Sequence, residues 1–244
     1  MTSTVTASWS SAYSRQAAYF RPEWSLVSEV LMIGFPSLIK NFSVSLVVII
    51  TNNLLKQIGG DSALGVFAIV NRLYSALNMP QTGIVQGMQP LVGYNFGQKQ
   101  FERVRTTVRL SLSATVVYGS LVCGVCLLMP AVLIALISKE SAIIVEGSTA
   151  LRLLALAYPL VGVSMVTAAS FQSVGRAKEA LLLTLGSIIL VKLPVLLLAT
   201  RLFSLTGIWA AEASSELILC IVSVILLRHF QGKTDAQWQY EGAK

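Results

Sequence analysis

Several charged and amide side chains lie deep inside long apolar stretches of this sequence. Lys40 follows GFPSLI and Arg72 follows FAIVN, and each lies about 15 Å along a helix from the start of its apolar stretch. A charge at that depth in a bilayer is costly, so it normally faces a cavity or a partner charge. Transporters bind their substrates near this depth. We therefore interpret five residues as candidates for the wall of a substrate cavity: Lys40, Asn41, Arg72, Gln86 and Tyr158.

Amide side chains in these stretches allow a second interpretation. Asn41, Asn52, Asn53 and Asn71 equally fit hydrogen bonds that join neighbouring membrane helices. Both interpretations of the amides stay open on the sequence, whereas the two isolated cations favour a cavity.

Lys192 and Glu216 form a separate candidate pair. They lie about 18 Å and about 14 Å from opposite faces of a hydrocarbon core about 30 Å thick, in consecutive apolar stretches joined by a short loop. Such stretches pack as antiparallel neighbours, so we predict a Lys192–Glu216 ion pair. Its role would be structural, because removing one partner strands the other charge in an apolar setting. Glu212, one turn nearer the loop, is expected to face Arg201.

The sequence lacks the residue patterns of an enzyme or a metal site. It has one histidine, His229, and no Gly-rich phosphate loop, metal-ligand cluster or nucleophile motif. Cys123 and Cys126 form a CxxC pattern, but inside the apolar run LVCGVCLLM, whereas reactive thiols need a polar, accessible setting. We expect no enzymatic activity, no metal and no organic cofactor.

Composition places these residues in a membrane protein. Hydrophobic residues make up 55% of the 244 residues and charged residues 12%, which is too few charges for a water-facing surface. The formal net charge of +7 is spread between the apolar runs, which argues against a nucleic-acid partner and suits a protein whose partner is the lipid bilayer. Six runs have the length of a membrane helix: 30–55, 63–87, 110–137, 143–174, 180–202 and 207–227. The fold class expected is an all-α integral membrane protein with a polar leader at 1–24, a six-helix lobe at 25–230 and a tail at 231–244.

The distribution of Lys and Arg predicts the orientation of the six helices. One side of the membrane carries Arg15, Arg21, Lys99, Arg103, Arg105, Arg109, Arg176, Lys178, Arg228, Lys233 and Lys244. The opposite side carries only Lys56, Lys139 and Arg201. The basic side belongs in the cytoplasm, together with both termini.

The stretch QPLVGYNFGQKQ, residues 89–100, is expected to end the second helix at the cytoplasmic face. Proline weakens a helix, and glycine adopts turn conformations that other residues avoid. The residues that carry this interpretation are Gln89, Pro90, Gly93, Tyr94, Asn95 and Gly97. FERVRTTVRL then restarts a helix along the interface. In the same second helix, Gly83 and Gly87 have the spacing that lets membrane helices pack closely.

Four segments closely resemble the C-terminal half of the MATE family, the multidrug and toxic compound extrusion transporters. They are GFPSLIKNFSVSL (34–46), FAIVNRLYSALNMPQTGIVQGMQPLVGYNFGQKQFERV (67–104), YPLVGVSMVTAASFQSVGRAKEALLL (158–183) and LTGIWAAEASSEL (205–217). The resemblance implies one six-helix lobe of a twelve-helix transporter in the bacterial plasma membrane. It also implies exchange of Na⁺ or H⁺ for small organic, cationic substrates.

Two departures from the family pattern shape what we expect. Where some relatives carry ion-coupling carboxylates, this sequence has Val44 and Val161, so the coupling-ion site is expected in the other lobe. The N-terminal lobe is absent from this sequence, so the expected partner is that lobe as a separate chain, or a second copy of this chain. Three alternatives stay open: a non-transporting fragment, a subunit that partners another membrane protein, and a flippase-like exporter of anionic cargo.

Overall fold

The computed structural model describes the backbone of residues 24–241 and the side chains of residues 39, 41–176 and 178–229. The chain divides into two compact units, residues 1–42 and 43–244, of which the second holds nearly all the described side chains. The leader expected at 1–24 and the tail expected at 231–244 lie outside the described side chains.

The described backbone is helical and contains no strand. The elements are α2 (Trp24–Gly97), α3 (Phe101–Leu128), α4 (Pro130–Ala135), α5 (Ser141–Ala155), α6 (Tyr158–Ser173), α7 (Ala177–Leu181), the π-helix η2 (Leu182–Lys192) and α8 (Leu193–Glu241). This confirms the all-α fold class expected from the apolar runs.

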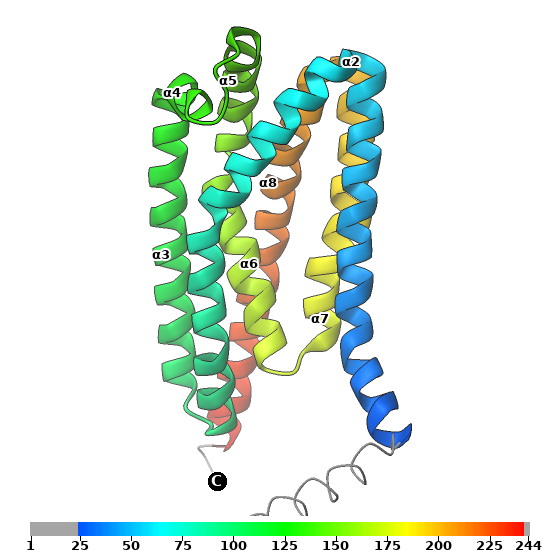
Figure 1. The fold of residues 1–244 in the computed structure, drawn as a ribbon. Helices are drawn as coiled ribbons and strands as arrows, with labels where there is room; N and C mark the ends of the chain where they lie inside the picture. The colour runs from blue at the N-terminus through cyan, green and yellow to red at the C-terminus, as the bar shows by residue number, and fades with distance from the viewer. Residues whose placement is uncertain (1–23, 242–244) are drawn as a thin grey trace, which may run out of the picture. The chain divides into compact units, whose positions relative to one another are not determined.

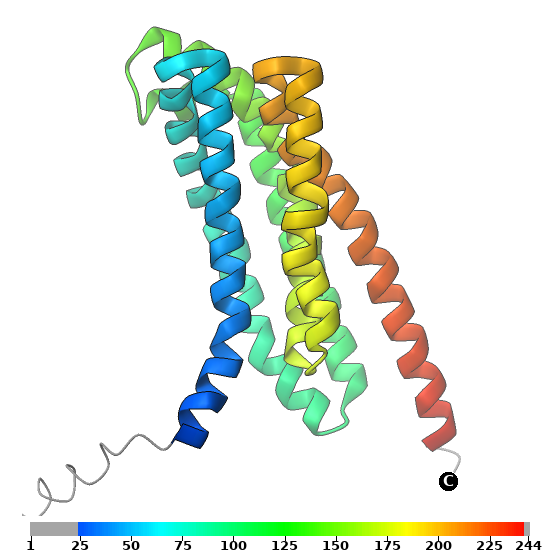
Figure 2. The same ribbon diagram turned by 90° about the vertical axis from the view of Figure 1, so that its right-hand side faces the viewer.

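The two longest helices each reverse direction once. Gly60 in α2 has φ of 67° and Ser204 in α8 has φ of 52°, and neither residue is helical. Glycine adopts positive φ freely, which explains the residue at the first reversal. Figures 1 and 2 show the chain reversing direction at the same end of both helices, so α2 and α8 each have one arm on either side of the reversal.

These reversals account for the six expected spans. Within the described residues, 41–97, 101–128 and 178–229 are apolar helices long enough to cross a membrane, and α5 with α6 forms a fourth segment bent by 47°. Residues 41–97 and 178–229 each contain one reversal and so have two arms, which is consistent with two of the expected spans in each. The turn after α2 and the turn between α6 and α7 lie at one end of these helices, and α4 lies at the opposite end (Figure 1).

The end of the second span differs from the expectation. Helix α2 continues to Gly97, ten residues past the expected boundary, with Pro90 and Gly93 inside it. The turn is made instead by Lys99, whose φ is 56°, and α3 restarts at Phe101 as expected. Membrane helices tolerate internal proline when neighbouring groups satisfy the freed backbone, so Pro90 does not end this one.

Close helix packing occurs at glycines other than those expected. A Cβ atom added at Gly119 of α3 would lie 2.5 Å from the carbonyl oxygen of Tyr158, and one at Gly162 of α6 would lie 2.7 Å from Thr115 Cβ. Gly83 and Gly87 have no such neighbour within 4 Å, so the close packing expected there was wrong. The tightest contacts join α3 to α6, and Gln81 of α2 also approaches Gly119, with its Nε2 2.7 Å from the added Cβ.

Buried polar groups hold α2 against α3 and α6. The side chain of Gln81 is fully buried, and its Nε2 donates to the carbonyl oxygens of Thr115 at 3.2 Å and Tyr158 at 3.0 Å. The Tyr118 hydroxyl donates to the carbonyl oxygen of Leu77 at 2.9 Å. These bonds connect α2, α3 and α6 through side chains donating to backbone oxygens, and polar side chains commonly join membrane helices in this way.

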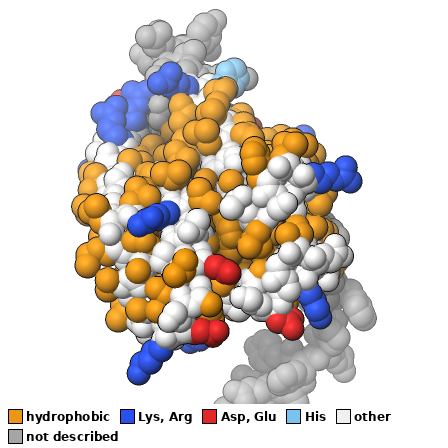
Figure 3. Space-filling view, turned by 90° about the horizontal axis from the view of Figure 1, so that it is seen from above, with side chains coloured by type: hydrophobic (Ala, Val, Ile, Leu, Met, Phe, Trp, Pro, Cys, Tyr) orange, Lys and Arg blue, Asp and Glu red, His pale blue; other side chains and the backbone are white. Residues whose placement is uncertain are grey.

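The outer surface is rich in exposed apolar side chains. Leu128, Leu136 and Leu190 are 82%, 78% and 71% exposed. The end-on view in Figure 3 has hydrophobic side chains over most of the visible face, with the charged ones scattered between them. A surface of this kind suits contact with lipid rather than water.

Candidate functional site

A cavity of about 210 Å³ lies among α2, α5, η2 and α8. Half of its lining residues are aliphatic, and the rest are aromatic or polar, a mixture found in many small-molecule sites. The lining residues with polar or aromatic side chains are Thr51, Phe67, Asn71, Tyr74, Lys192, Trp209, Glu212 and Ser215.

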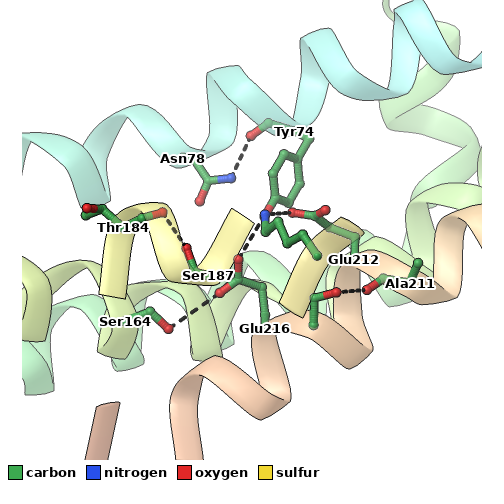
Figure 4. A network of polar contacts seen from close by, with 10 residues as sticks. Tyr74, Asn78, Ser164, Thr184, Ser187, Ala211, Glu212 and Glu216 are labelled. Carbon is green, nitrogen blue, oxygen red and sulfur yellow. Dashed lines mark hydrogen bonds and ion pairs between the residues drawn. The ribbon is translucent and has the colours of Figure 1, made fainter. Parts of the chain in front are cut away.

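Two glutamates share one lysine at this cavity. Lys192 Nζ lies 2.6 Å from Glu212 Oε1 and 3.1 Å from Glu216 Oε1. Figure 4 shows Glu212 and Glu216 projecting from α8 toward the same point, with the Tyr74 ring reaching it from α2. One ammonium therefore neutralises only one of two carboxylates, provided both are ionised.

The local fold explains this arrangement. Glu212 and Glu216 are four residues apart on α8, so their side chains lie on the same helical face. Lys192 is the last residue of the π-helix η2, which packs against α8.

The two carboxylates differ in exposure and surroundings. The Glu212 side chain is 29% exposed and lines the cavity. The Glu216 side chain is 8% exposed and lies behind the cavity wall, where Ser164 Oγ of α6 donates to its Oε2 at 3.5 Å. Glu216 is thus the buried partner of Lys192, and Glu212 is the one that a molecule in the cavity can contact.

Aromatic rings surround the same cavity. The Phe67 and Trp209 rings lie 5.9 Å apart, and the Tyr74 ring lies 5.0 Å from the Tyr158 ring behind it. Phe67, Tyr74 and Trp209 line the cavity, whereas Tyr158 is fully buried. Aromatic faces beside a carboxylate provide the environment that binds organic cations in proteins.

Three of the five cavity-wall candidates chosen from the sequence do not line this cavity. Arg72 and Gln86 are exposed on α2 and do not line this cavity, and Tyr158 lies in the core. The side chain of Lys40 lies outside the described residues, and Asn41 belongs to the unit of residues 1–42. Arg72, Gln86 and Tyr158 are therefore not part of the described cavity, and Lys40 and Asn41 stay predictions.

The expected contact between Lys192 and Glu216 is present, whereas the expected contact between Glu212 and Arg201 is absent. Glu212 faces Lys192 rather than Arg201, which is exposed near the Ser204 reversal. The sequence held the signal for this triad, because the four-residue spacing of the two glutamates places both toward the same partner. Asn71, expected either in a cavity or between helices, lines the cavity.

The described part of the chain contains no metal-binding cluster, and its three cysteines form no disulfide. No group of three or more His, Cys, Asp or Glu side chains there is arranged to hold a metal ion. Cys123, Cys126 and Cys220 are all free, with Cys126 buried. The acid–lysine cluster of Lys192, Glu212 and Glu216 is thus the main concentration of buried charge among the described side chains.

Comparison with known proteins places this arrangement in a family. The family model described as MatE matches residues 36–198, which is more than half of the chain. The chain belongs to the MATE family. The resemblance of the four sequence segments to this family is therefore confirmed.

The matches to MATE relatives cover most of this chain but less than half of each relative. The multidrug export protein MepA of Staphylococcus saprophyticus is 22% identical over 210 residues, covering 86% of this chain and 46% of the relative. The probable multidrug resistance protein NorM of Thermotoga maritima is 26% identical, covering 77% of this chain and 41% of the relative. The chain thus spans about half the length of the curated relatives it matches.

A solved MATE structure shares the fold of this chain. The MATE multidrug transporter DinF-BH is 33% identical with a TM-score of 0.72, covering 84% of this chain and 46% of that chain. The six-helix lobe of this MATE protein therefore corresponds to about half of a solved transporter.

Proposed function

We propose that this MATE chain is the C-terminal half of a multidrug efflux antiporter that exports organic cations across the bacterial plasma membrane. The observation that carries the proposal is the extended match to proteins named as multidrug exporters, which covers most of this chain and about half of each relative. A twelve-helix transporter binds its substrate between two lobes, so a second six-helix lobe completes the path. That lobe is a separate chain, the rest of a longer form of this chain, or a second copy.

The charge of the cavity supports a cationic substrate. Glu212 and Glu216 outnumber Lys192, and Arg72 lies outside the cavity lining. Buried surplus negative charge is stabilised by a positive ligand and opposes an anionic one. This favours export of cations over the alternative of anionic cargo.

Export is driven in this proposal by exchange with Na⁺ or H⁺, and the coupling site lies in the second lobe. This follows the expectation from the family resemblance, in which Val44 and Val161 stand where coupling carboxylates would be expected in this lobe. The basic helix ends face the cytoplasm, as the excess of Lys and Arg at one side predicts.

Efflux from cells tests the proposal. Bacteria lacking their own multidrug exporters would produce this chain together with the N-terminal lobe of a MATE relative, or alone, and ethidium accumulation would be followed by fluorescence. Lower accumulation in cells with both lobes than in cells with either lobe supports the proposal. Lower accumulation with this chain alone than with an empty vector supports pairing of two copies, whereas accumulation equal to the empty-vector strain in every strain, with both chains present in the membrane, overturns the proposal.

A further inference from the structure

The acid–lysine cluster carries one more negative than positive charge, and the cavity reaches only part of it. Lys192 and Glu212 line the cavity, whereas Glu216 lies behind the wall. If Lys192 remains with Glu216 at 3.1 Å, the pair is neutral and the uncompensated charge resides on Glu212. An ionised carboxylate in such a setting needs a positive partner.

We propose that Glu212 binds the cationic group of an organic ligand, and that the Lys192 ammonium occupies this position while the ligand is absent. This inference rests on the proposed function and names the residue that binds the substrate's charge in this lobe. Lys192 acts as an internal counter-ion that competes with the ligand for Glu212. When a ligand enters, Lys192 keeps Glu216 as its partner and stays paired.

The cavity wall suits such a ligand. Phe67, Tyr74 and Trp209 line the same cavity as Glu212. An organic cation over an aromatic face gains an attraction that is stronger where water is excluded. The remaining wall is mostly aliphatic, for example Val47 and Leu196, which suits the alkyl groups around a quaternary nitrogen.

The size of the cavity indicates which part of a ligand it holds. Drug-sized ligands occupy pockets of about 300–1,000 Å³. A cavity of about 210 Å³ instead fits a charged headgroup with short substituents. The rest of a larger cationic drug would then extend toward the second lobe.

The environment of Lys192 permits the exchange. Lys192 ends the π-helix η2, whose hydrogen bonding differs from that of the α8 arm that follows. Within η2 the Ser187 hydroxyl donates to the carbonyl oxygen of Thr184 at 2.7 Å. A side-chain hydrogen bond thus supplements the backbone hydrogen bonds of the π-helix. The Lys192 side chain is 25% exposed, and the stem of a lysine is flexible, so its ammonium can leave Glu212 without leaving Glu216.

Equilibrium binding of radiolabelled tetraethylammonium to the purified full chain in detergent tests this inference. Tetraethylammonium keeps its charge at every pH and has the size of a headgroup. We expect saturable binding to the unmodified chain, and at least tenfold weaker binding to Glu212→Gln, which removes the receiving charge. The matched control is Glu146→Gln, the same substitution at an exposed residue of α5 outside the cavity, and its binding should equal that of the unmodified chain.

A double variant separates the internal counter-ion from a purely structural lysine. Lys192→Met combined with Glu216→Gln keeps the surplus of one negative charge and removes the competitor. We expect it to bind tetraethylammonium at least threefold more tightly than the unmodified chain. A folded double variant that loses binding overturns the inference, as does unchanged binding in Glu212→Gln or the absence of saturable binding to the unmodified chain.

The binding experiment tests this inference and the efflux experiment tests the proposed function, so either one can be contradicted without the other. Efflux that requires both lobes, with tetraethylammonium binding indifferent to Glu212→Gln, would overturn this inference and leave the proposed function standing. Saturable, Glu212-dependent binding without efflux in any two-lobe strain would overturn the proposed function and leave the binding site standing.

Discussion

Lys192 Nζ lies 3.1 Å from Glu216 Oε1, and the Glu216 side chain is only 8% exposed. Burying a charge is costly unless a partner compensates it, and removing one member of a buried pair leaves the other uncompensated. The loss of Lys192 strands two carboxylates, whereas its loss together with the Glu216 charge leaves only the more exposed Glu212.

The first prediction concerns the stability of this cluster. Lys192→Met is expected to lower the free energy of unfolding by about 3–5 kcal/mol, the usual cost of breaking a buried ion pair. Adding Glu216→Gln should recover at least half of that loss, because the most buried charge is then absent. Thermal unfolding in detergent, followed by circular dichroism, measures both. Losses that simply add in the double variant would show that the two residues do not interact.

The second prediction concerns the contact between α3 and α6. Gly119→Ala is expected to destabilise the lobe by about 1–3 kcal/mol, because the new Cβ would meet the carbonyl oxygen of Tyr158 at 2.5 Å. Gly124→Ala on the same helix is the control, since nothing lies within 4 Å of its added Cβ. The control should be neutral or stabilise by up to about 1 kcal/mol, as alanine favours helix over glycine. Equal effects of the two substitutions in thermal unfolding would contradict the packing described.

The third prediction concerns Gln81. Gln81→Met keeps the length of the side chain but removes its hydrogen bonds to the carbonyl oxygens of Thr115 and Tyr158. Interhelical hydrogen bonds in membranes contribute about 0.6 kcal/mol on average and up to about 1.7 kcal/mol. We expect the free energy of unfolding to fall by about 1–2 kcal/mol from the loss of the two bonds together. Gln86→Met, at an exposed position of α2, should cost less than about 0.5 kcal/mol, and a larger cost there than at Gln81 would refute the assignment.

The fourth prediction concerns orientation in the membrane. In a variant without native cysteines, Lys139→Cys between α4 and α5 should react with an impermeant maleimide added to intact cells. Lys99→Cys in the turn after α2 should react only after the membrane is permeabilised, because the proposed orientation places the basic helix ends in the cytoplasm. The opposite labelling pattern would reverse the proposed topology.

Hydropathy was sufficient to predict most of the fold. The six spans follow from apolar length, and the reversals at Gly60 and Ser204 fall in the two loops expected between those spans. The end of the second span was harder to predict, because Pro90 and Gly93 are common breakers in water but lie inside α2 here. In a membrane helix the local preference of these residues is weaker than the need to satisfy backbone groups.

Only one part of the candidate site could be predicted from the sequence: the contacts between residues at equal depth in the membrane on neighbouring helices. Similar depths on antiparallel neighbours were enough to pair Lys192 with Glu216. Arg72 and Tyr158 have the residue types and depths of a cavity wall, but depth does not tell which side of a helix faces the cavity. Arg72 is exposed and Tyr158 is packed in the core, whereas Tyr74 of the same α2 arm as Arg72 lines the cavity. Rotation of a helix about its axis is decided by packing against several neighbours, which a single sequence does not specify.

Gradient-driven transport tests the central claim most directly. Proteoliposomes containing this chain and an N-terminal MATE lobe would be given ethidium and an imposed Na⁺ or H⁺ gradient. The account predicts ethidium movement that follows one of these gradients, stops when the gradient is dissipated, and falls at least tenfold with Glu212→Gln. Ethidium movement equal to that of protein-free liposomes, with both lobes folded and inserted, would contradict the account.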